Sequence, residues 1–360
     1  MAHSKPTAWE KSIASLEKQI PDLMTELQIP GVSLAIVRDA RIAWTKSFGV
    51  RDRSTGVPVD DDTIFSAQSM SKPVFAYRVM KLYELGVLDL DAPLTQYTPD
   101  VFVKNDPRLK EITARRVLSH TTGLPNWRSR EDPLKINFPP GSKWQYSGEG
   151  YHYLQSVVTR LVGHTDETQC GKFEMGYRVC ATNFGEYIEA NLLRPFGMNS
   201  SGYVLTPSMA MNVARRHDKE GKPMPQKPGT ALDVARYGSA GSLMTTATDY
   251  AKFLIEVMAP KPTDSYRLNE LTREEMLKSH IDIPSPPSPI KASWALGWQI
   301  WHLDQGDLVV HGGDDTGWHS QSAFSQDRKT GFVILTNGDN GDKMIFNDLL
   351  KPLVGEFILS

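Results

Sequence analysis

The strand-forming segments of this chain lie at its two ends, and this separation constrains the fold more than any other feature. The apolar run from Gly31 to Val37 predicts a strand, and residues 42–50 predict a second strand directly after it. The last third predicts four further strands, short and separated by turns, at residues 296–303, 308–311, 320–325 and 332–336. We therefore expect one sheet that is built from both chain ends.

Helical patterns flank these strands and occupy the middle of the chain. Apolar spacing predicts a helix at residues 8–28, kinked or split by Pro21, and another at 343–358. Further helices are expected at residues 73–85, 107–119, 150–162, 184–194 and 248–258. The pattern predicts a discontinuous α/β domain, residues 1–66 and 231–360, that receives an inserted helical domain, residues 67–230.

One stretch of the helical part, residues 166–183, is polar and loop-like and is interpreted as an insertion. It carries both cysteines of the chain, Cys170 and Cys180. Two cysteines in 360 residues make no disulfide framework, and their spacing fits no zinc pattern. Two reduced thiols are the expectation, while a local disulfide that closes the loop remains open.

The charge balance excludes some partners. Lys plus Arg total 40 and Asp plus Glu total 42, whereas a nucleic-acid-binding protein normally shows a basic excess. No stretch reaches the roughly 18 apolar residues of a membrane span. The first residues contain no apolar run typical of a signal peptide. A cytoplasmic protein is the expectation, although a leader removed from the sequence would leave the same pattern.

A Ser-x-x-Lys motif, Ser69 to Lys72, opens the helix expected at 73–85. Residues three apart lie on one helix face, so the Lys72 amine can reach the Ser69 hydroxyl. A helix N-terminus favours a developing negative charge, and a buried lysine can lose its proton near neutral pH. This motif also arises by chance, so it indicates a nucleophile only together with other elements.

Two further elements could complete such a site. Tyr146 precedes the helix expected at 150–162, and a neighbouring ammonium would make its phenolate accessible well below the usual pKa. His311 and Gly313 end a predicted strand, where glycine lets the backbone approach a substrate closely. The following N–H, that of Asp314, could form an oxyanion hole with the N–H of Ser69.

The three elements, in this order, resemble the serine β-lactamase and penicillin-binding-protein superfamily. The closest resemblance is to class C β-lactamase-like serine hydrolases, including family VIII carboxylesterases and D-amino-acid peptidases. It covers residues 8–358 and extends to other segments: IPGVSLAIV (29–37), LSHTTGLP (118–125), FPPGSKWQYSGEGY (138–151), LLRPFGM (192–198), AGSLMTTATDYAKFL (240–254) and HGGDDTGW (311–318). The resemblance implies an α+β fold with an antiparallel sheet, an all-helical part, and an active site between them.

The resemblance also implies roles for individual residues. Ser69 would be the acylated nucleophile, Lys72 would share its proton, and Tyr146 would be the base. His311 matches the first position of the family's Lys-Thr-Gly motif and Gly313 the last. His311 would be a catalytic residue that helps Tyr146 to activate the water. Asp314 would contribute only its backbone N–H. No metal and no cofactor are expected.

The sequence departs from the family pattern at two positions. Gly148 stands where β-lactamases have the asparagine of Tyr-x-Asn, which removes a hydrogen bond to the substrate amide. His311 replaces a permanently charged lysine by a residue that is mostly neutral at pH 7. Both changes favour small esters over amides that carry a carboxylate. Trp318 and Trp127 could line the acyl pocket or could simply pack.

We therefore expect a serine hydrolase that acts through an acyl-enzyme, with carboxylesterase as the first hypothesis. A β-lactamase, a D-amino-acid peptidase or amidase, or an acyltransferase would use the same residues. An inactive binding protein with this fold is the hypothesis outside the enzyme class. The oligomeric state stays open.

Overall fold

An antiparallel sheet of nine strands forms the centre of the computed structural model, which describes residues 6–99, 101–226, 229–260, 264–284 and 290–359. From one edge to the other, the strands are β3 (Val57–Pro58), β2 (Arg41–Asp52), β1 (Gly31–Arg38), β13 (Thr330–Thr336), β12 (Trp318–Ser325), β11 (Gly306–Asp315), β10 (Gln299–Leu303), β9 (Lys291–Trp294) and β8 (Ile281–Asp282).

The two chain ends meet inside this sheet, as the sequence predicts. Strand β1 pairs with β2 on one side and with β13 on the other, where Val32 lies opposite Thr336. Seven of the eight β1 residues are buried, because helices cover both faces of the sheet. The apolar run of β1 is typical of a strand that is covered on both sides.

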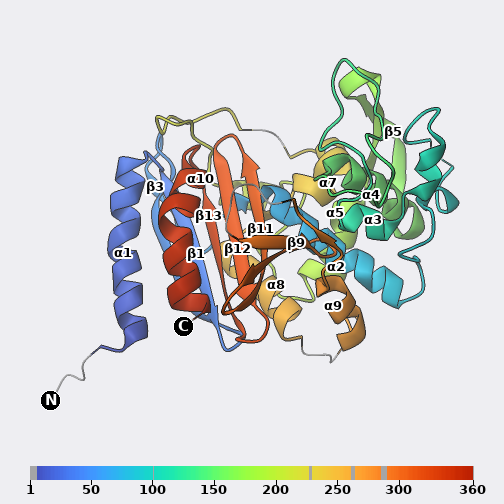
Figure 1. Ribbon diagram of the computed structural model, residues 1–360. Helices are drawn as coiled ribbons and strands as arrows, with labels where there is room; N and C mark the ends of the chain where they lie inside the picture. Colours follow the sequence, from blue (N-terminus) through green and yellow to red (C-terminus); the bar gives the residue numbers. More distant parts are fainter. Residues whose placement is uncertain (1–5, 100, 227–228, 261–263, 285–289, 360) are drawn as a thin grey trace.

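The helices on one face come from the two ends of the chain (Figure 1). They are α1 (Ala8–Glu26) and a C-terminal helical segment made of α10 (Gly341–Lys343), η6 (Met344–Leu349), α11 (Leu350–Pro352) and η7 (Leu353–Ile358). Trp9 packs edge-to-face on Phe357 and joins them, with ring centroids 5.1 Å apart. Helix α8 (Ala247–Met258) packs on the opposite face.

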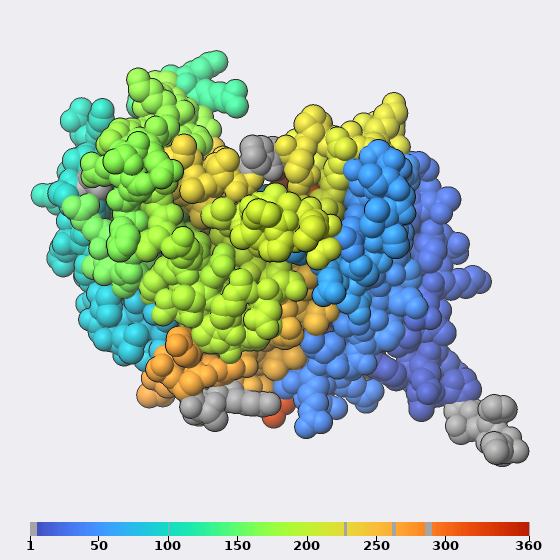
Figure 2. Space-filling model, turned by 180° about the vertical axis from the view of Figure 1, so that it is seen from behind, coloured from blue at the N-terminus to red at the C-terminus, as the bar shows by residue number. Residues whose placement is uncertain are grey.

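The remaining helices lie beyond that opposite face (Figure 1), and Figure 2 shows the middle of the chain, in green, gathered on the side away from the blue N-terminal residues. These remaining helices are η1 (Gln68–Met70), α2 (Ser71–Glu84), η2 (Leu94–Gln96), η3 (Pro107–Glu111), α3 (Ala114–Leu118), α4 (Gly148–Val162), η4 (Glu174–Gly176), α5 (Phe184–Ile188), η5 (Glu189–Leu193), α6 (Pro207–Ala210), α7 (Ala231–Gly241) and α9 (Glu270–Leu277). A two-stranded ladder, β4 (Phe65–Ser66) with β7 (Met244–Thr245), lies beside η1. The fold class expected from the sequence is confirmed, while the domain boundaries stay a prediction.

The polar insertion corrects one expectation. Residues 166–183 do not form a loop but a hairpin of β5 (Thr165–Lys172) and β6 (Arg178–Thr182), so the inserted part is not all-helical. Cys170 lies opposite Cys180 in this hairpin, and the two form a disulfide rather than two reduced thiols. The hairpin was missed because its first strand is polar and largely solvent-facing, which leaves no apolar alternation to detect.

Other boundaries also differ from the sequence expectation. Helix α1 runs unbroken through Pro21, so the proline does not split it. The strand expected at residues 296–303 begins only at Gln299, as β10, because a turn at Gly297 separates it from β9, a strand that the sequence did not predict. Gly297 has a φ of +89°, and a Cβ there would lie 2.3 Å from the Cβ of Ala76. Helices α7 and α9 were not predicted, although the capping pair Thr230 and Asp233 marks the start of α7.

Among the described residues, no helix is both long and apolar enough to cross a membrane.

Candidate active site

Ser69 lies in the short turn η1 that opens α2, at the point where the sheet meets the helices. Gln68, directly before it, has a left-handed backbone with φ of 49°, and its side chain donates to the Ser66 hydroxyl at 2.6 Å. A non-glycine residue in this conformation is held there by its surroundings. The turn therefore presents Ser69 in a fixed orientation.

Strand β11 approaches this turn closely because Gly313 has no side chain. A Cβ at Gly313 would lie 2.2 Å from the Ala67 carbonyl oxygen and 2.4 Å from the Ser320 hydroxyl. From the sequence, this glycine was expected to let the backbone approach a substrate. The structure shows close approach of the strand to the turn that carries Ser69. Asp314 follows Gly313 and lines the same cavities as Ser69.

Lys72 lies one turn into the helix, with its Nζ 3.2 Å from the Ser69 Oγ and 2.9 Å from the carbonyl oxygen of Ala240 in α7. It is 1 % exposed, and none of the described carboxylates forms an ion pair with it. Burial lowers the pKa of Lys72 to about 7. A neutral amine is therefore well populated at neutral pH, as the sequence analysis expected for a buried lysine.

Tyr146 presents the face of its ring to Lys72, with the Nζ 4.7 Å from the ring centroid. Burial raises the pKa of the phenol well above its usual value, and a hydrogen bond with Ser69 offsets this only in part. The expectation of an accessible phenolate is therefore wrong. The cation lies over the ring rather than beside the oxygen, and the low dielectric disfavours the charged form.

His311 lies 4 % exposed near Tyr146, with ring centroids 6.4 Å apart. Burial, and then the charge of Lys72, lower its pKa to about 3. Its Nδ1 is 2.7 Å from the carbonyl oxygen of Gly312. Because a carbonyl only accepts, Nδ1 carries the proton, and Nε2 of the neutral ring is left as an acceptor.

His120 is buried behind Tyr146 and contacts that residue and its neighbour Ser147. Its ring lies tilted against that of Tyr146, with centroids 4.2 Å apart, and its Nδ1 accepts the Ser147 N–H at 3.0 Å. His120 therefore holds the loop that carries Tyr146. Sequence reasoning missed Ala240 and Asn126, because backbone carbonyls and lone asparagines carry no motif.

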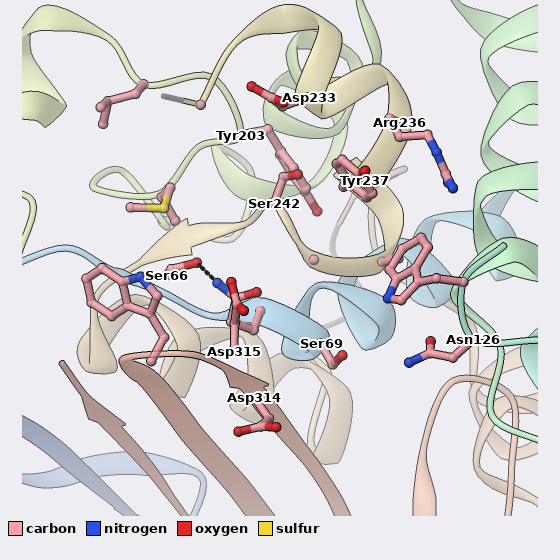
Figure 3. A pocket seen from close by; sticks show the side chains of 18 of the residues that line it. Ser66, Ser69, Asn126, Tyr203, Asp233, Arg236, Tyr237, Ser242, Asp314 and Asp315 are labelled. Carbon is pink, nitrogen blue, oxygen red and sulfur yellow. Dashed lines mark hydrogen bonds between the residues drawn. The ribbon is translucent and has the colours of Figure 1, made fainter. Parts of the chain in front are cut away.

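Two cavities meet at Ser69. The first, of about 670 Å³, lies between α7 and the end of β11, where Figure 3 shows Asp233, Arg236 and Tyr237 across from Asp314. The second, of about 950 Å³, is walled by aromatic side chains. Those aromatic residues are Trp144, Tyr146, Trp294, Trp301 and Phe346.

The remaining residues singled out in the sequence border the first cavity. Trp318 lines the first cavity, but it is 4 % exposed and packs edge-to-face on Phe65 with ring centroids 6.2 Å apart. This residue therefore both lines the pocket and packs in the core. Trp127 lines it too, and its ring lies against Gly148. The structure thus brings Ser69, Lys72, Tyr146 and His311 together at one place.

No group of three or more His, Cys, Asp or Glu side chains converges as metal ligands within the described part of the chain.

The fold and this set of residues define a class of proteins, and comparison with known proteins identifies it. The β-lactamase family model matches residues 16–354. The chain is 25 % identical to penicillin-binding protein 4 of Amycolatopsis lactamdurans, over 95 % of this chain and 90 % of that protein. It is 27 % identical to the esterase EstB of Burkholderia gladioli, over 71 % of this chain and 74 % of the esterase.

The fold is also that of solved structures. A class C β-lactamase superposes with a TM-score of 0.74 at 17 % identity, covering 97 % of this chain and 98 % of that chain. The chain belongs to the β-lactamase family and has the class C-like fold of that superfamily. It is a serine hydrolase of this family.

Proposed function

We propose that this serine hydrolase is a carboxylesterase that acts on small esters without a carboxylate near the reacting bond. The observation that carries the proposal is the state of His311. Its Nδ1 donates to the Gly312 carbonyl, and its low pKa keeps the ring neutral. The imidazole can therefore accept a hydrogen bond, but it offers neither a charge nor a proton to a substrate carboxylate.

The other charges around the two cavities support the same proposal. The acidic residues that line them are Glu174, Asp233, Asp314, Asp315 and Asp342. Among the described lining residues, the fixed positive charge is that of Arg236, and Glu149 already pairs with it. An anionic substrate would meet like charges here, whereas a neutral ester would not.

The mechanism begins with proton transfer from Ser69. The neutral Lys72 amine, which still donates one N–H to Ala240, accepts the Ser69 proton while Oγ attacks the ester carbonyl. The N–H groups of Ser69 and Asp314 stabilise the oxyanion. Tyr146, a phenol at rest, gives its own proton to the departing alkoxide oxygen, and the Lys72 ammonium returns the Ser69 proton to Tyr146. Water then hydrolyses the acyl-enzyme by the reverse sequence of proton transfers.

The same acyl-enzyme would serve a β-lactamase, a D-amino-acid peptidase or an acyltransferase. The relatives include both a penicillin-binding protein and an esterase, so their names do not distinguish amide from ester substrates. The neutral His311 and the acidic lining favour the ester.

A matched pair of esters tests the observation directly. Phenyl acetate and 3-carboxyphenyl acetate share an acyl group and differ by one carboxylate on the leaving group. We expect kcat/KM, divided by the hydroxide rate constant of each ester, to be lower for the carboxylate. For nitrocefin and D-alanine p-nitroanilide, kcat/KM divided by the hydroxide rate constant should be lower than for either ester.

Ser69→Ala provides the control, because it should abolish the acyl adduct seen by intact-mass spectrometry. Higher normalised turnover of the carboxylate ester, or of nitrocefin or the amide, would overturn the proposal.

A further inference from the structure

Asn126 holds a central place that no sequence motif indicates. Of the described residues, three line both cavities: the nucleophile Ser69, the oxyanion residue Asp314, and Asn126. A side chain shared by both cavities borders the point where the reacting carbonyl must lie. Figure 3 shows Asn126 with its amide nitrogen on the side that faces Ser69.

The N-terminus of α4 fixes this asparagine at two points. Its backbone carbonyl accepts the Glu149 N–H at 2.9 Å, and its Oδ1 accepts the Gly148 N–H at 3.0 Å. Because a backbone N–H can only donate, the atom facing Gly148 must be the oxygen. The NH₂ group is therefore directed away from α4, into the cavity.

Gly148 cannot supply the side chain that the family pattern has at that position. A Cβ there would lie 2.7 Å from the Asn126 carbonyl oxygen and 2.7 Å from the Trp127 ring. The 126–127 segment thus occupies the space that a side chain at position 148 would need. Asn126 brings an amide into this region from a different loop.

The two cavities hold different parts of the substrate. Tyr146, which protonates the leaving alcohol in the proposed mechanism, lines the second cavity and not the first. The alcohol therefore leaves through the second cavity, and the acyl group extends into the first. A donor at the junction meets the acyl atoms nearest the carbonyl.

We propose that Asn126 determines acyl specificity by donating a hydrogen bond from Nδ2 to an oxygen close to the reacting carbonyl in the acyl group. This inference rests on the proposed function and names its substrate class. The substrates are esters of alkoxy-, hydroxy- or acylamino-substituted acids rather than of plain alkanoic acids.

The test uses two isosteric esters, p-nitrophenyl methoxyacetate and p-nitrophenyl butanoate, in which an oxygen replaces a methylene. The rate of Ser69 acylation is followed by intact mass and by p-nitrophenol release, and is divided by the hydroxide rate constant. We expect the wild type to prefer methoxyacetate by about fivefold, the value of one ordinary hydrogen bond.

Asn126→Asp separates specificity from structure. It keeps an oxygen that can accept the Gly148 N–H and removes the NH₂ donor. We expect an unchanged melting temperature and loss of the methoxyacetate preference. Asn126→Ala should lose the preference and also some stability. Asn191→Ala, at an asparagine that lines neither cavity and donates to the Tyr187 carbonyl, should keep the preference.

A preference that survives in Asn126→Asp, or that is absent from the wild type, overturns the inference and leaves the esterase proposal standing. Failure of both esters to acylate Ser69 in the wild type overturns the esterase proposal itself, and this inference with it.

Discussion

At the scale of single residues, burial decides the chemistry of the site. Lys72, Tyr146 and His311 are all buried, and each is driven toward its neutral form. For the lysine this produces a base near pH 7, and for the tyrosine a phenol. For the histidine it produces an uncharged acceptor. The same low dielectric therefore assigns three different roles, because the lysine and the histidine are cations when charged, the tyrosine is an anion, and the three groups start from different ordinary pKa values.

The lowered pKa of Lys72 predicts how kcat/KM depends on pH. Its pKa is lowered to about 7, so below that pH the amine is protonated and cannot accept the Ser69 proton. We expect kcat/KM for a non-ionising ester to rise about tenfold per pH unit below 7 and to level off above it. A pH–rate profile from 5 to 9 measures this. Lys72→Arg should be nearly inactive throughout that range, and a flat wild-type profile would contradict the assignment.

At the scale of elements, ion pairs and packing hold the helical part around the site. Glu149, at the start of α4, bonds Arg128 at 2.6 Å and Arg236 of α7 at 2.5 Å. Arg236 lines the first cavity, and its guanidinium lies 5.1 Å from the Trp127 ring centroid. The hairpin of β5 and β6 packs against α7 from the other side. The position of α7, and of Ala240 within it, depends on the Glu149–Arg236 ion pair and on the packing of this hairpin.

The lowered pKa of Glu149 predicts how the free energy of unfolding changes with pH. Burial alone would raise its pKa, but the Arg128 hydrogen bond and the charges of Arg236 and Arg128 lower it to about 2. The unfolded chain therefore binds the proton first, and this stabilisation is present above about pH 4.5 and lost as pH falls toward 2. Glu149→Gln should lower the free energy of unfolding at pH 7 by about 3 kcal/mol.

Urea unfolding at pH 7 and pH 3 measures the effect, and the difference between variant and wild type should shrink at pH 3. An equal difference at both values would contradict the ionic role.

The Cys170–Cys180 disulfide makes a second prediction at this scale. Closing a short loop stabilises by about 2 kcal/mol through the unfolded chain. We expect dithiothreitol to lower the melting temperature of the wild type, while the double variant Cys170→Ser, Cys180→Ser melts at that lower temperature with or without reductant. If the melting temperature of the wild type does not change with reductant and equals that of the double variant, the disulfide does not stabilise the protein. The cytoplasmic location expected from the sequence stays a prediction, and persistent disulfides are uncommon in that compartment.

At the scale of the whole molecule, the sheet makes the two chain ends part of one structure with the site. Strand β1 comes from the first forty residues and β13 from the last forty, and β11, two strands from β13, supports the Ser69 turn. Loss of packing at the chain ends should therefore destabilise the site as well.

Phe357→Ala tests this connection. Phe357 is 1 % exposed and contacts Trp9 of α1, far along the chain from Ser69. We expect a loss of about 3 kcal/mol, with circular dichroism and esterase activity lost in one common thermal transition. Phe346→Ala, at a 53 % exposed position of the same helical segment, should change the melting temperature little. Two separate transitions in the Phe357 variant would contradict a single cooperative unit.

The sequence by itself determined the parts of this protein that depend on local pattern. Apolar runs and helical spacing sufficed for the sheet from both chain ends and for most helices. The Ser-x-x-Lys spacing placed Lys72 beside Ser69. Only the tertiary structure decided the tautomer of His311, the place of Asn126, and the hairpin at Cys170. Those features arise from burial and from contacts between residues distant in the chain, neither of which has a period or a spacing in the sequence.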